Sequence, residues 1–386
     1  MKVLHACDSI VGGTGSYLAE LLPHQLDLLG IDNVLLIMPK EHLAYLDPNL
    51  IDRGLKIELF KRRSRFVGLF HLLIKFFAVN RRFKPDIVHA HSSGAGALLR
   101  TVRRMIRGRL IFCSHGWAFD IPAKPTTRHI IQWIERALAY RADRIVAISQ
   151  HEYDRAIEIG IPASKLVLIY NGVSRSPPIA VRAQWDDHRL KILFVGRFDR
   201  QKGLDLLLEA IEPLGETVTL RAIGEPVVTA NYNPMVALPF VEYYGWRTRG
   251  DVAAQMMAAD VLIMPSRWEG FGLAAIEAMR MSLPVAASSV GGLREIIRDG
   301  QFGFVFPPND VLALRACIQG LTGPALAAMR VAGHRRFLDC FTADRMVAEI
   351  DMLYREVLTE SGQEKASRIP ATSEVMTPEL SNKTGR

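Results

Sequence analysis

Cysteine is scarce in this sequence, and its four copies are scattered at Cys7, Cys113, Cys317 and Cys340. No two form a C-x-x-C pair, which excludes a disulfide framework and a cysteine zinc site and is typical of a reducing compartment. Long apolar runs are lacking too. No segment reaches the roughly 18 uncharged apolar residues of a membrane span, and the start of the chain lacks a signal-peptide core. We therefore expect a soluble, cytoplasmic protein.

A complete dinucleotide fingerprint is also missing. The segment VGGTGSYLAELL (11–22) forms a glycine turn before an expected helix, but counting from Gly13 puts Leu18 at the third glycine position. The acid expected about 20 residues further on is poorly placed as well. An oxidoreductase is therefore disfavoured, although Gly12 and Gly13 still let the backbone approach a diphosphate.

Acidic residues are almost absent from residues 61–119, which hold thirteen lysines and arginines and a single acid, Asp86. The whole chain has a net charge of only +8. A local basic field of this kind attracts nucleic acid or an anionic membrane surface.

Apolar runs of strand length alternate with helix-length segments along the chain. The expected strands are 2–6, 33–38, 56–60, 86–91, 109–114, 144–149 and 166–170, then 191–196, 217–223, 241–245, 261–265 and 284–288. This alternation predicts α/β architecture with doubly wound parallel sheets.

An irregular, proline-containing stretch divides the chain into two Rossmann-like domains. The expected parts are an N-terminal domain (1–172), a linker (173–190), a C-terminal domain (191–340), a helix (341–358) that could return to the N-terminal domain, and a disordered tail (360–386). The tail is polar and has no core pattern.

Two cations stand at the start of an expected helix in VGRFDRQKG (195–203). Arg197 follows a strand, and Lys202 opens the helix, where a positive charge opposes the helix dipole. Either both are solvated surface residues, or an anion binds at the helix start.

Two acids flank a second strand-to-helix crossover in RWEGFGLAAIEAM (267–279). Glu269 and Glu277 are separated by seven residues, and glycines after Glu269 free the backbone. Carboxylates there suit sugar or ribose hydroxyls, although a dipole-complementing acid and an exposed helix residue are the simpler alternatives. The backbone N–H groups that can face a ligand belong to Phe271, Gly272 and Leu273.

Taken together, these segments resemble the retaining GT-B glycosyltransferases with a Glu-x-seven-Glu signature, of the group 1 or family 4 type. The resemblance covers residues 1 to about 355. Its motifs are GGTG (12–15), SHGW (114–117), SQHEYDRAIEIGIPASKLVLIYNGV (149–173), VGRFDRQKG (195–203), PSRWEGFGLAAIEAM (265–279), LPVAAS (283–288) and VGGLREIIRDGQFGFVF (290–306).

The resemblance implies a role for each candidate residue of the C-terminal domain. Arg197 and Lys202 would hold the donor diphosphate and stabilise it as the leaving group. Glu269 would contact the transferred sugar, with the N–H groups of residues 271–273 nearby. Glu277 would bind the ribose hydroxyls.

In the N-terminal domain, the resemblance implies that His115 lies in the interdomain cleft near the donor sugar. It also implies that Gly12 and Gly13 close on the diphosphate. The segment YYGWR falls where such enzymes hold the base, which makes Tyr244 and Trp246 candidates for that contact.

The resemblance implies a GT-B fold and the transfer of a sugar, with retention of configuration, from a UDP- or GDP-sugar to a lipid-linked or glycan acceptor. Enzymes of the other glycosyltransferase architecture usually hold a metal with Asp-x-Asp. That motif is absent here, so we expect no metal and no cofactor. Alternatives are an epimerase or a phosphorylase of the same fold, or a nucleic-acid-binding protein. The last leaves Glu269 and Glu277 without a role, so we expect no nucleic-acid partner.

The segment RRSRFVGLFHLLIKFFAVNRRFK (62–84) carries a wide apolar arc between two basic clusters. This pattern favours a helix at an anionic bilayer surface and hence a peripheral protein on the inner face of the cell membrane. The alternative is an ordinary buried crossover helix. The residues expected to meet membrane or acceptor are Arg62, Arg63, Arg65, Phe70, Lys75 and Phe76.

The pair His89 and His91 suggests a metal site, but no third ligand stands out in the sequence. We therefore expect the two side chains to pack or to line the cleft.

Overall fold

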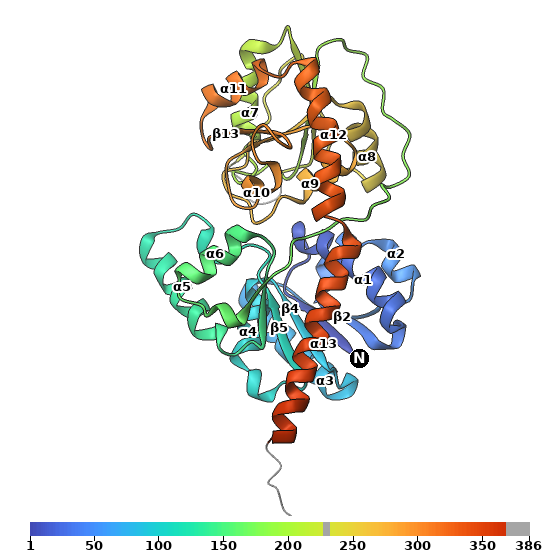
Figure 1. Cartoon of the computed structure of the whole chain (residues 1–386), viewed down its shortest axis with the longest axis vertical. Coiled ribbons are helices and arrows are strands. Elements are labelled where there is room, and N and C mark those ends of the chain that lie inside the picture. The colour runs from blue at the N-terminus through green and yellow to red at the C-terminus, as the bar shows by residue number, and fades with distance from the viewer. Residues whose placement is uncertain (227–231, 368–386) are drawn as a thin grey trace, which may run out of the picture.

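The computed structural model describes residues 1–226 and 232–367 and has two α/β domains stacked end to end (Figure 1). The first contains a seven-stranded parallel sheet in the order β3-β2-β1-β4-β5-β6-β7. Its strands are β1 (Val3–Cys7), β2 (Val34–Pro39), β3 (Lys56–Phe60), β4 (Ile87–His91), β5 (Arg109–Cys113), β6 (Arg144–Ala147) and β7 (Leu166–Leu168). Its helices are α1 (Gly13–Leu29), α2 (Pro48–Asp52), α3 (Arg65–Phe83), α4 (Ser93–Thr101), α5 (Pro125–Ala139) and α6 (Gln150–Glu158).

The second domain repeats the scheme with a six-stranded parallel sheet in the order β10-β9-β8-β11-β12-β13. Its strands are β8 (Leu190–Val195), β9 (Val218–Ile223), β10 (Val241–Tyr243), β11 (Val261–Met264), β12 (Val285–Ser288) and β13 (Phe304–Phe306). Its helices are α7 (Leu204–Ile211), α8 (Arg249–Ala258), α9 (Leu273–Arg280), α10 (Leu293–Ile297), α11 (Val311–Gln319) and α12 (Gly323–Cys340).

The prediction of two doubly wound parallel-sheet domains is confirmed. The central strands β1 and β4 of the first sheet are buried throughout because helices cover both faces. In both sheets the strand order reverses beside the first strand, between β1 and β4 and between β8 and β11. Ligands of such folds bind beyond the carboxyl ends of the strands at this switch point.

The chain passes between the domains at two adjacent places. The amide of Val173 donates to the carbonyl of Phe341 at 2.9 Å, and the amide of Ala343 donates back to Val173 at 2.9 Å. The last helix, α13 (Ala343–Ser367), then runs along the first domain beside α1 (Figure 1). The predicted start of the tail at residue 360 is wrong because α13 continues to Ser367; the rest of the predicted tail lies outside the described residues.

Helix α3 packs against β2 and β3 as a crossover helix. It buries one row of side chains at helical spacing, and these are Leu72, Phe76, Val79 and Phe83. The expectation that Phe76 faces membrane or acceptor is therefore wrong. Its ring is 0% exposed and fills the core between the helix and the sheet.

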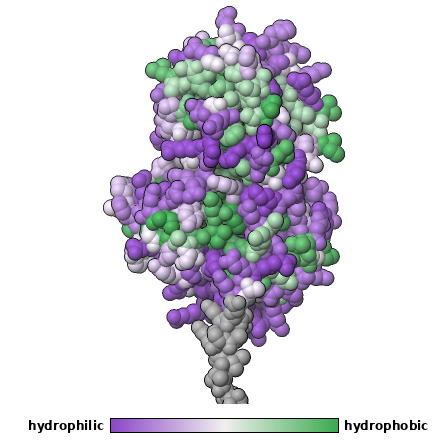
Figure 2. Space-filling model, viewed as in Figure 1, coloured by the Kyte–Doolittle hydropathy of each residue, from purple (hydrophilic) through white to green (hydrophobic). Residues whose placement is uncertain are grey.

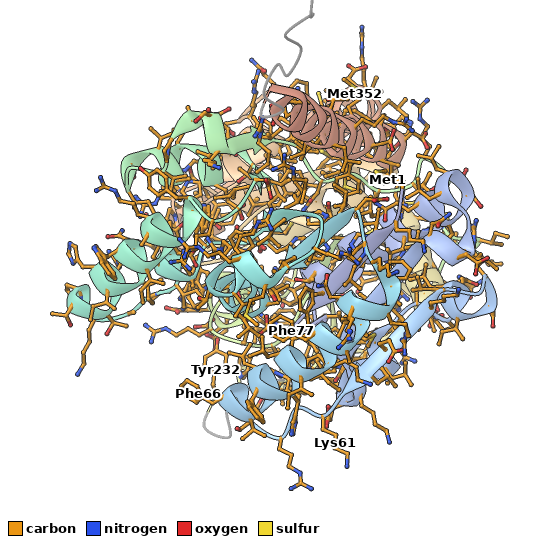
Figure 3. All side chains as sticks on the ribbon, turned by 90° about the horizontal axis from the view of Figure 1, so that it is seen from below. Met1, Lys61, Phe66, Phe77, Tyr232 and Met352 are labelled. Carbon is orange, nitrogen blue, oxygen red and sulfur yellow. The ribbon has the colours of Figure 1, made fainter. Side chains whose placement is uncertain are left out.

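The amino-terminal half of α3 carries a second, exposed apolar row. Phe66 is 85% exposed and Phe70 is 61% exposed, and Ile74 continues the row one turn later. Figure 3 shows Phe66 at the amino end of α3, with Lys61 pointing away from the body of the protein. Arg63 is also exposed here, whereas the side chain of Arg65 lies outside the described residues.

Part of the basic stretch is neutralised by acids from elsewhere in the chain. Arg100 is fully buried and pairs with Glu135 at 2.7 Å. Lys75 and Arg82 both pair with Glu58, whereas the half-buried Arg62 contacts the uncharged ring nitrogen of His42 and keeps its charge. Arg103 and Arg109 both pair with Asp143. The charge read along the sequence therefore overstates the basic field at the surface.

Within the described part of the chain, no single helix is long and apolar enough to cross a membrane. Helices α11 and α12 reach the required length and composition only as a pair, and they are bent by 99°.

Candidate active site at the domain interface

The second sheet carries a lysine–glutamate pair at its switch point. Lys202 lies just before α7, in the loop after β8, and Glu269 lies in the loop after β11. The Nζ atom of Lys202 is 2.5 Å from Oε2 of Glu269. Both side chains are mostly buried, with 20% and 11% exposed, so their charges are only weakly screened by water.

Arg197 lies in the same loop and is held by two neighbours. Its Nε atom is 2.9 Å from Oδ2 of Asp199, and its guanidinium donates to Oε1 of Gln201 at 2.7 Å. Oδ1 of Asp199 accepts from the amide of Lys202 at 3.1 Å. Gln201 also donates to the carbonyl of Trp268, so the two loops are tied together.

The glycine turn before α9 is shaped by close backbone packing. Gly272 has a φ of +110°, in the left-handed region, and a Cβ there would lie 2.5 Å from Leu293. Gly291 has a φ of +48°, and a Cβ there would lie 1.7 Å from the carbonyl oxygen of Glu269. Only glycine fits at either position, which holds the backbone of residues 269–273 in place.

Two loops of the first domain lie opposite this turn. A Cβ on Gly13, at the start of α1, would come within 4.0 Å of Leu273. A Cβ on Gly116 would come equally close to Cα of Gly270. The GGTG and SHGW segments therefore meet the Glu269–Leu273 turn across the interface. Both segments precede this turn by more than 100 residues in the sequence.

His115 reaches this interface with a strained backbone, at a φ of +53°. Its ring is turned into the first domain, where Nε2 lies 3.0 Å from Nδ1 of His91 and Nδ1 lies 3.7 Å from Sγ of Cys113. Burial lowers the pKa of His115 to about 3, so the imidazole is neutral at physiological pH.

Glu277 is not the exposed helix residue that was the simpler alternative. Burial raises its pKa, a shift that the charges of Arg249 and Arg280 reduce. Arg249 also forms an ion pair with Glu20 of α1 at 3.1 Å. A carboxylate is thus set beside two cations where the domains meet.

Glu152, on α6, is a buried acid that the sequence reasoning missed. Its Oε2 atom accepts from the hydroxyl of Ser114 and the amide of Ile148, both at 3.2 Å. Its Oε1 atom meets no hydrogen-bond partner within residues 1–226 and 232–367. Burial raises the pKa of Glu152 to about 8, and Ser149, at the start of the same helix, donates to the carbonyl of Gly270 at 3.1 Å.

Comparison with known proteins identifies the family of both domains. Residues 11–176 match the family model "Glycosyltransferase Family 4", and residues 189–323 match "Glycosyl transferases group 1". The chain belongs to the GT-B glycosyltransferases.

The chain is also similar to individual curated proteins and to solved structures. The chain is 35% identical to an uncharacterized 41.2 kDa protein in the cps region of Klebsiella pneumoniae, over 65% of this chain and 74% of that one. It is 25% identical to an Escherichia coli UDP-Gal:alpha-D-GlcNAc-diphosphoundecaprenol alpha-1,3-galactosyltransferase, over 78% and 81% of the two chains. The fold is similar to that of Anabaena HepE, solved with UDP-glucose, with a TM-score of 0.74 and 19% identity over 94% of this chain and 100% of that one.

Tyr244 and Trp246 of the glycosyltransferase lie beyond the end of β10, apart from the Lys202–Glu269 pair. The amide of Gly224 donates to the carbonyl of Gly245 at 3.0 Å, which fixes this segment beside β9. The ring of Tyr244 faces the guanidinium of Arg221 at 5.2 Å, and Trp246 is half-exposed. The guanidinium of Arg247 also lies over the Tyr244 ring, at 5.5 Å, and the Tyr244 hydroxyl donates to Glu242, so the ring is already engaged by its neighbours.

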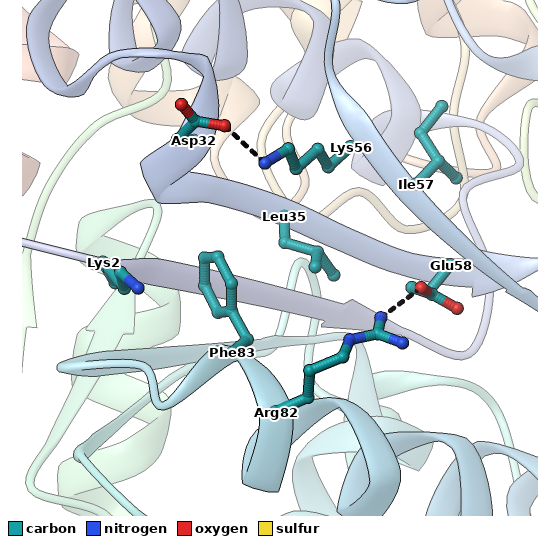
Figure 4. A pocket seen from close by; sticks show the side chains of 8 residues that line it. All are labelled: Lys2, Asp32, Leu35, Lys56, Ile57, Glu58, Arg82 and Phe83. Atoms are coloured by element: carbon teal, nitrogen blue, oxygen red, sulfur yellow. Dashed lines mark hydrogen bonds and ion pairs between the residues drawn. The ribbon is translucent and has the colours of Figure 1, made fainter.

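A pocket of about 470 Å³ lies at the opposite edge of the first sheet (Figure 4). It opens at the amino ends of β1, β2 and β3, away from the switch point. Four of its charged residues form ion pairs, Lys56 with Asp32 and Arg82 with Glu58, and the ammonium of Lys2 lies over the ring of Phe83. Because this pocket lies at the amino ends of the strands, away from the Lys202–Glu269 pair, it is not the candidate active site.

The structure adds contacts that the sequence reasoning missed, above all those of Asp199 and Glu295. The spacing of Asp199, three residues before Lys202, is a signal for a loop in which the aspartate side chain accepts from a backbone amide.

Glu295 of α10 accepts from the amides of Gln150 and His151 at 2.8 and 2.9 Å, capping α6 from the other domain. No pattern in the sequence around Glu295 predicts that interdomain contact. Hydrophilic residues gather at this waist between the domains (Figure 2).

Proposed function

We propose that this glycosyltransferase moves a sugar, with retention of configuration, from a nucleotide-diphosphate sugar to a lipid-linked or polysaccharide-precursor acceptor. The transfer takes place at the cytoplasmic surface of the membrane. The observation that carries the proposal is the meeting of Lys202 and Glu269 between the starts of α7 and α9, opposite the glycine turn of α1.

The chemistry follows from the charges at this interface. Breaking a glycosyl–phosphate bond builds negative charge on the diphosphate, and preorganised cations and backbone N–H groups lower that barrier. Lys202 and Arg197 supply the cations, each held by a carboxylate, Glu269 or Asp199, until the anion binds. In this mechanism the side chains do the work that a metal does in other glycosyltransferases.

The sugar and the nucleoside lie on either side of the diphosphate. Glu269 and the N–H groups of residues 271–273 contact the transferred sugar, and Glu277 accepts hydrogen bonds from the ribose. Tyr244 and Trp246 contact the base. The imidazole of His115 turns out of its buried contacts to meet the sugar, and Gly12 and Gly13 close on the diphosphate.

The relatives favour a UDP-sugar and a lipid-linked acceptor. The Escherichia coli relative is named for UDP-Gal and a diphosphoundecaprenol-linked sugar, and HepE was solved with UDP-glucose. The Klebsiella relative is described from a cps region. We therefore prefer UDP over GDP and place the reaction in polysaccharide biosynthesis.

A transfer assay tests the proposed function. The enzyme is incubated with radiolabelled UDP- and GDP-sugars and a lipid-linked oligosaccharide fraction, with and without EDTA. We expect label in the lipid phase from one donor, release of the nucleoside diphosphate, insensitivity to EDTA, and the donor's anomeric configuration in the product by NMR. Inverted product, a requirement for a divalent ion, or an epimerised free nucleotide sugar would each contradict the corresponding part of the proposal.

We predict that Glu277→Gln weakens binding of the nucleoside diphosphate about 10- to 100-fold, because a hydrogen bond to a charged group contributes roughly 1.5–3 kcal/mol. Titration calorimetry with UDP measures the change. Glu209→Gln, which alters an exposed carboxylate on α7, is the control and should bind UDP like the wild type. Equal affinity of Glu277→Gln and the wild type would remove Glu277 from the site.

The exposed row on α3 supports the membrane part of the proposal. We predict that the double variant Phe66→Ser, Phe70→Ser binds vesicles containing anionic lipid at least about tenfold more weakly, because each exposed ring loses roughly 1.5–3 kcal/mol of apolar burial. Vesicle flotation at low salt measures the loss. Leu312→Ser, at an exposed position on α11, is the control. If the wild type does not bind these vesicles, the result contradicts this part of the proposal.

A further inference from the structure

A cluster of three histidines lies at the switch point of the first sheet, outside the proposed donor site. His5 on β1 pairs directly with His89 on β4, and His91 follows on the same face of β4. All three are 0% exposed, covered by α1 and α13. One ring nitrogen from each lies within 4.8 Å of the other two. Sequence reasoning missed this group because His5 is 84 residues from His89.

A separate partner holds the far nitrogen of each ring. Nε2 of His5 lies 2.7 Å from Oε1 of Gln25 on α1. Nδ1 of His91 lies 3.0 Å from Nε2 of His115. Nδ1 of His89 lies 2.6 Å from the hydroxyl of Tyr354 on α13. Such outer contacts fix the ring orientation and tautomer of metal-binding histidines.

The nitrogens that remain are directed at one another. Nδ1 of His5 and Nε2 of His91 are 2.9 Å apart. Nε2 of His89 has no hydrogen-bond partner within the part of the chain that the structure describes, although it is buried. Histidines at a core position are ordinarily satisfied by hydrogen bonds. An ion between the three nitrogens would give the unpartnered atom of His89 a ligand bond.

We propose that His5, His89 and His91 bind a divalent transition-metal ion, with zinc as the best fit, through Nδ1 of His5 and Nε2 of the other two. Imidazole suits zinc, and three protein ligands leave a fourth position for water. Zinc–nitrogen bonds of about 2.0–2.1 Å in a tetrahedral site hold the ligand nitrogens roughly 3.3–3.4 Å apart. The present nitrogens lie 2.9 Å apart for His5 and His91 and within 4.8 Å for all three, so the rings must turn when the ion binds. All three imidazoles are neutral, because burial lowers the pKa of His5 to about 4 and those of His89 and His91 well below their usual value.

The ion has a structural role and reaches the donor site only through the hydrogen bond between His91 and His115. Through Tyr354 it fastens α13 to the first sheet, and through His91 it sets the proton on His115. With metal on Nε2 of His91, Nδ1–H donates to Nε2 of His115, whose own proton then sits on Nδ1. Without metal, His91 donates to His5 and His115 donates to His91. Metal binding therefore reverses the tautomer of His115 without releasing a proton.

The test measures metal in the full-length protein. The wild type is produced in zinc-supplemented medium, dialysed as folded protein against EDTA, and analysed by elemental mass spectrometry. We expect one zinc per chain, resistant to EDTA until the protein is unfolded, because the ligands are sealed from solvent. Refolding with cobalt chloride should give the visible absorption of tetrahedral cobalt.

Three variants separate this site from adventitious binding. His89→Asn removes a ligand and should retain less than about a tenth of the zinc, and Tyr354→Phe, which keeps all ligands, should bind it roughly 10- to 100-fold more weakly. His129→Ala removes an exposed histidine on α5 and should match the wild type. A wild type without metal after both treatments overturns the proposal, as does equal zinc in Tyr354→Phe and wild type under competition with a chelator. The Tyr354→Phe comparison decides the matter if His89→Asn does not fold.

Discussion

Replacing Lys202 by alanine is expected to lower kcat roughly 100- to 1,000-fold, about 2.7–4 kcal/mol of lost transition-state stabilisation. Lys202 lies 2.5 Å from Glu269 at the start of α7, where the diphosphate's growing charge would be met. The variant also leaves Glu269 without its cation in a mostly buried site. The unpaired carboxylate then repels the anionic donor and weakens its binding. Initial rates of nucleoside-diphosphate release with the preferred donor measure the loss.

Arg200→Ala is the matched control for this prediction. Arg200 is a cation two residues away in the same loop, and its side chain is exposed. It should therefore change the rate by no more than a few-fold. A similar loss in both variants would indicate a general field effect, and an unchanged rate in Lys202→Ala would remove Lys202 from the mechanism.

Replacing Glu152 by glutamine is expected to stabilise the protein increasingly as the pH rises. The pKa of Glu152 is raised to about 8 by burial in the folded state, against about 4.3 in an unfolded chain. Below the pKa of the unfolded chain, Glu152 is protonated in both states and does not change the free energy of unfolding. Between the two values only the unfolded chain ionises, so the free energy of unfolding falls with pH; above the folded value the loss is constant.

Glutamine resembles the protonated acid and does not titrate. The difference in the free energy of unfolding between Glu152→Gln and wild type should therefore grow by about 2–5 kcal/mol between pH 5 and pH 8.5. Urea denaturation at both pH values measures it. Glu158→Gln alters an exposed carboxylate of the same helix and should leave the pH dependence close to that of wild type. A pH-independent difference for Glu152→Gln would mean that this buried acid ionises normally.

The fold was predictable because the composition of each strand indicates whether the strand is buried. Runs such as residues 34–39 and 261–264 are apolar throughout, which marks a strand covered on both faces, and helical segments lie between them. The Lys202 and Glu269 loops were predictable for a similar reason. Each carries glycine and charge at a strand-to-helix junction, and parallel strands bring such junctions to one edge.

Features that depend on distant partners could not be read from the sequence. The basic stretch seemed unopposed because the acids that pair with Arg100 and Arg103, Glu135 and Asp143, lie beyond it. The burial of Phe76 depends on how α3 is rotated against the sheet, which a helix with apolar residues on several sides does not reveal.

The histidine cluster shows the same limitation. His89 and His91 are visible as a pair, but His5 becomes their neighbour only because β1 and β4 are adjacent at the switch point. Likewise, α13 is longer than predicted. Its last turns, up to Ser367, are polar and carry little core pattern, so composition alone favoured a tail from residue 360.

Thermal unfolding with UDP, GDP, ADP and their sugar conjugates measures whether the Lys202–Glu269 interface binds a nucleotide-diphosphate sugar. A ligand at about 100 times its dissociation constant adds roughly 2.7 kcal/mol to the folded state. We expect a rise in Tm with UDP and a UDP-sugar for the wild type, and a smaller rise for Lys202→Ala and Glu277→Gln. No rise with any nucleotide at millimolar concentration, or an equal rise in wild type and both variants, would contradict it.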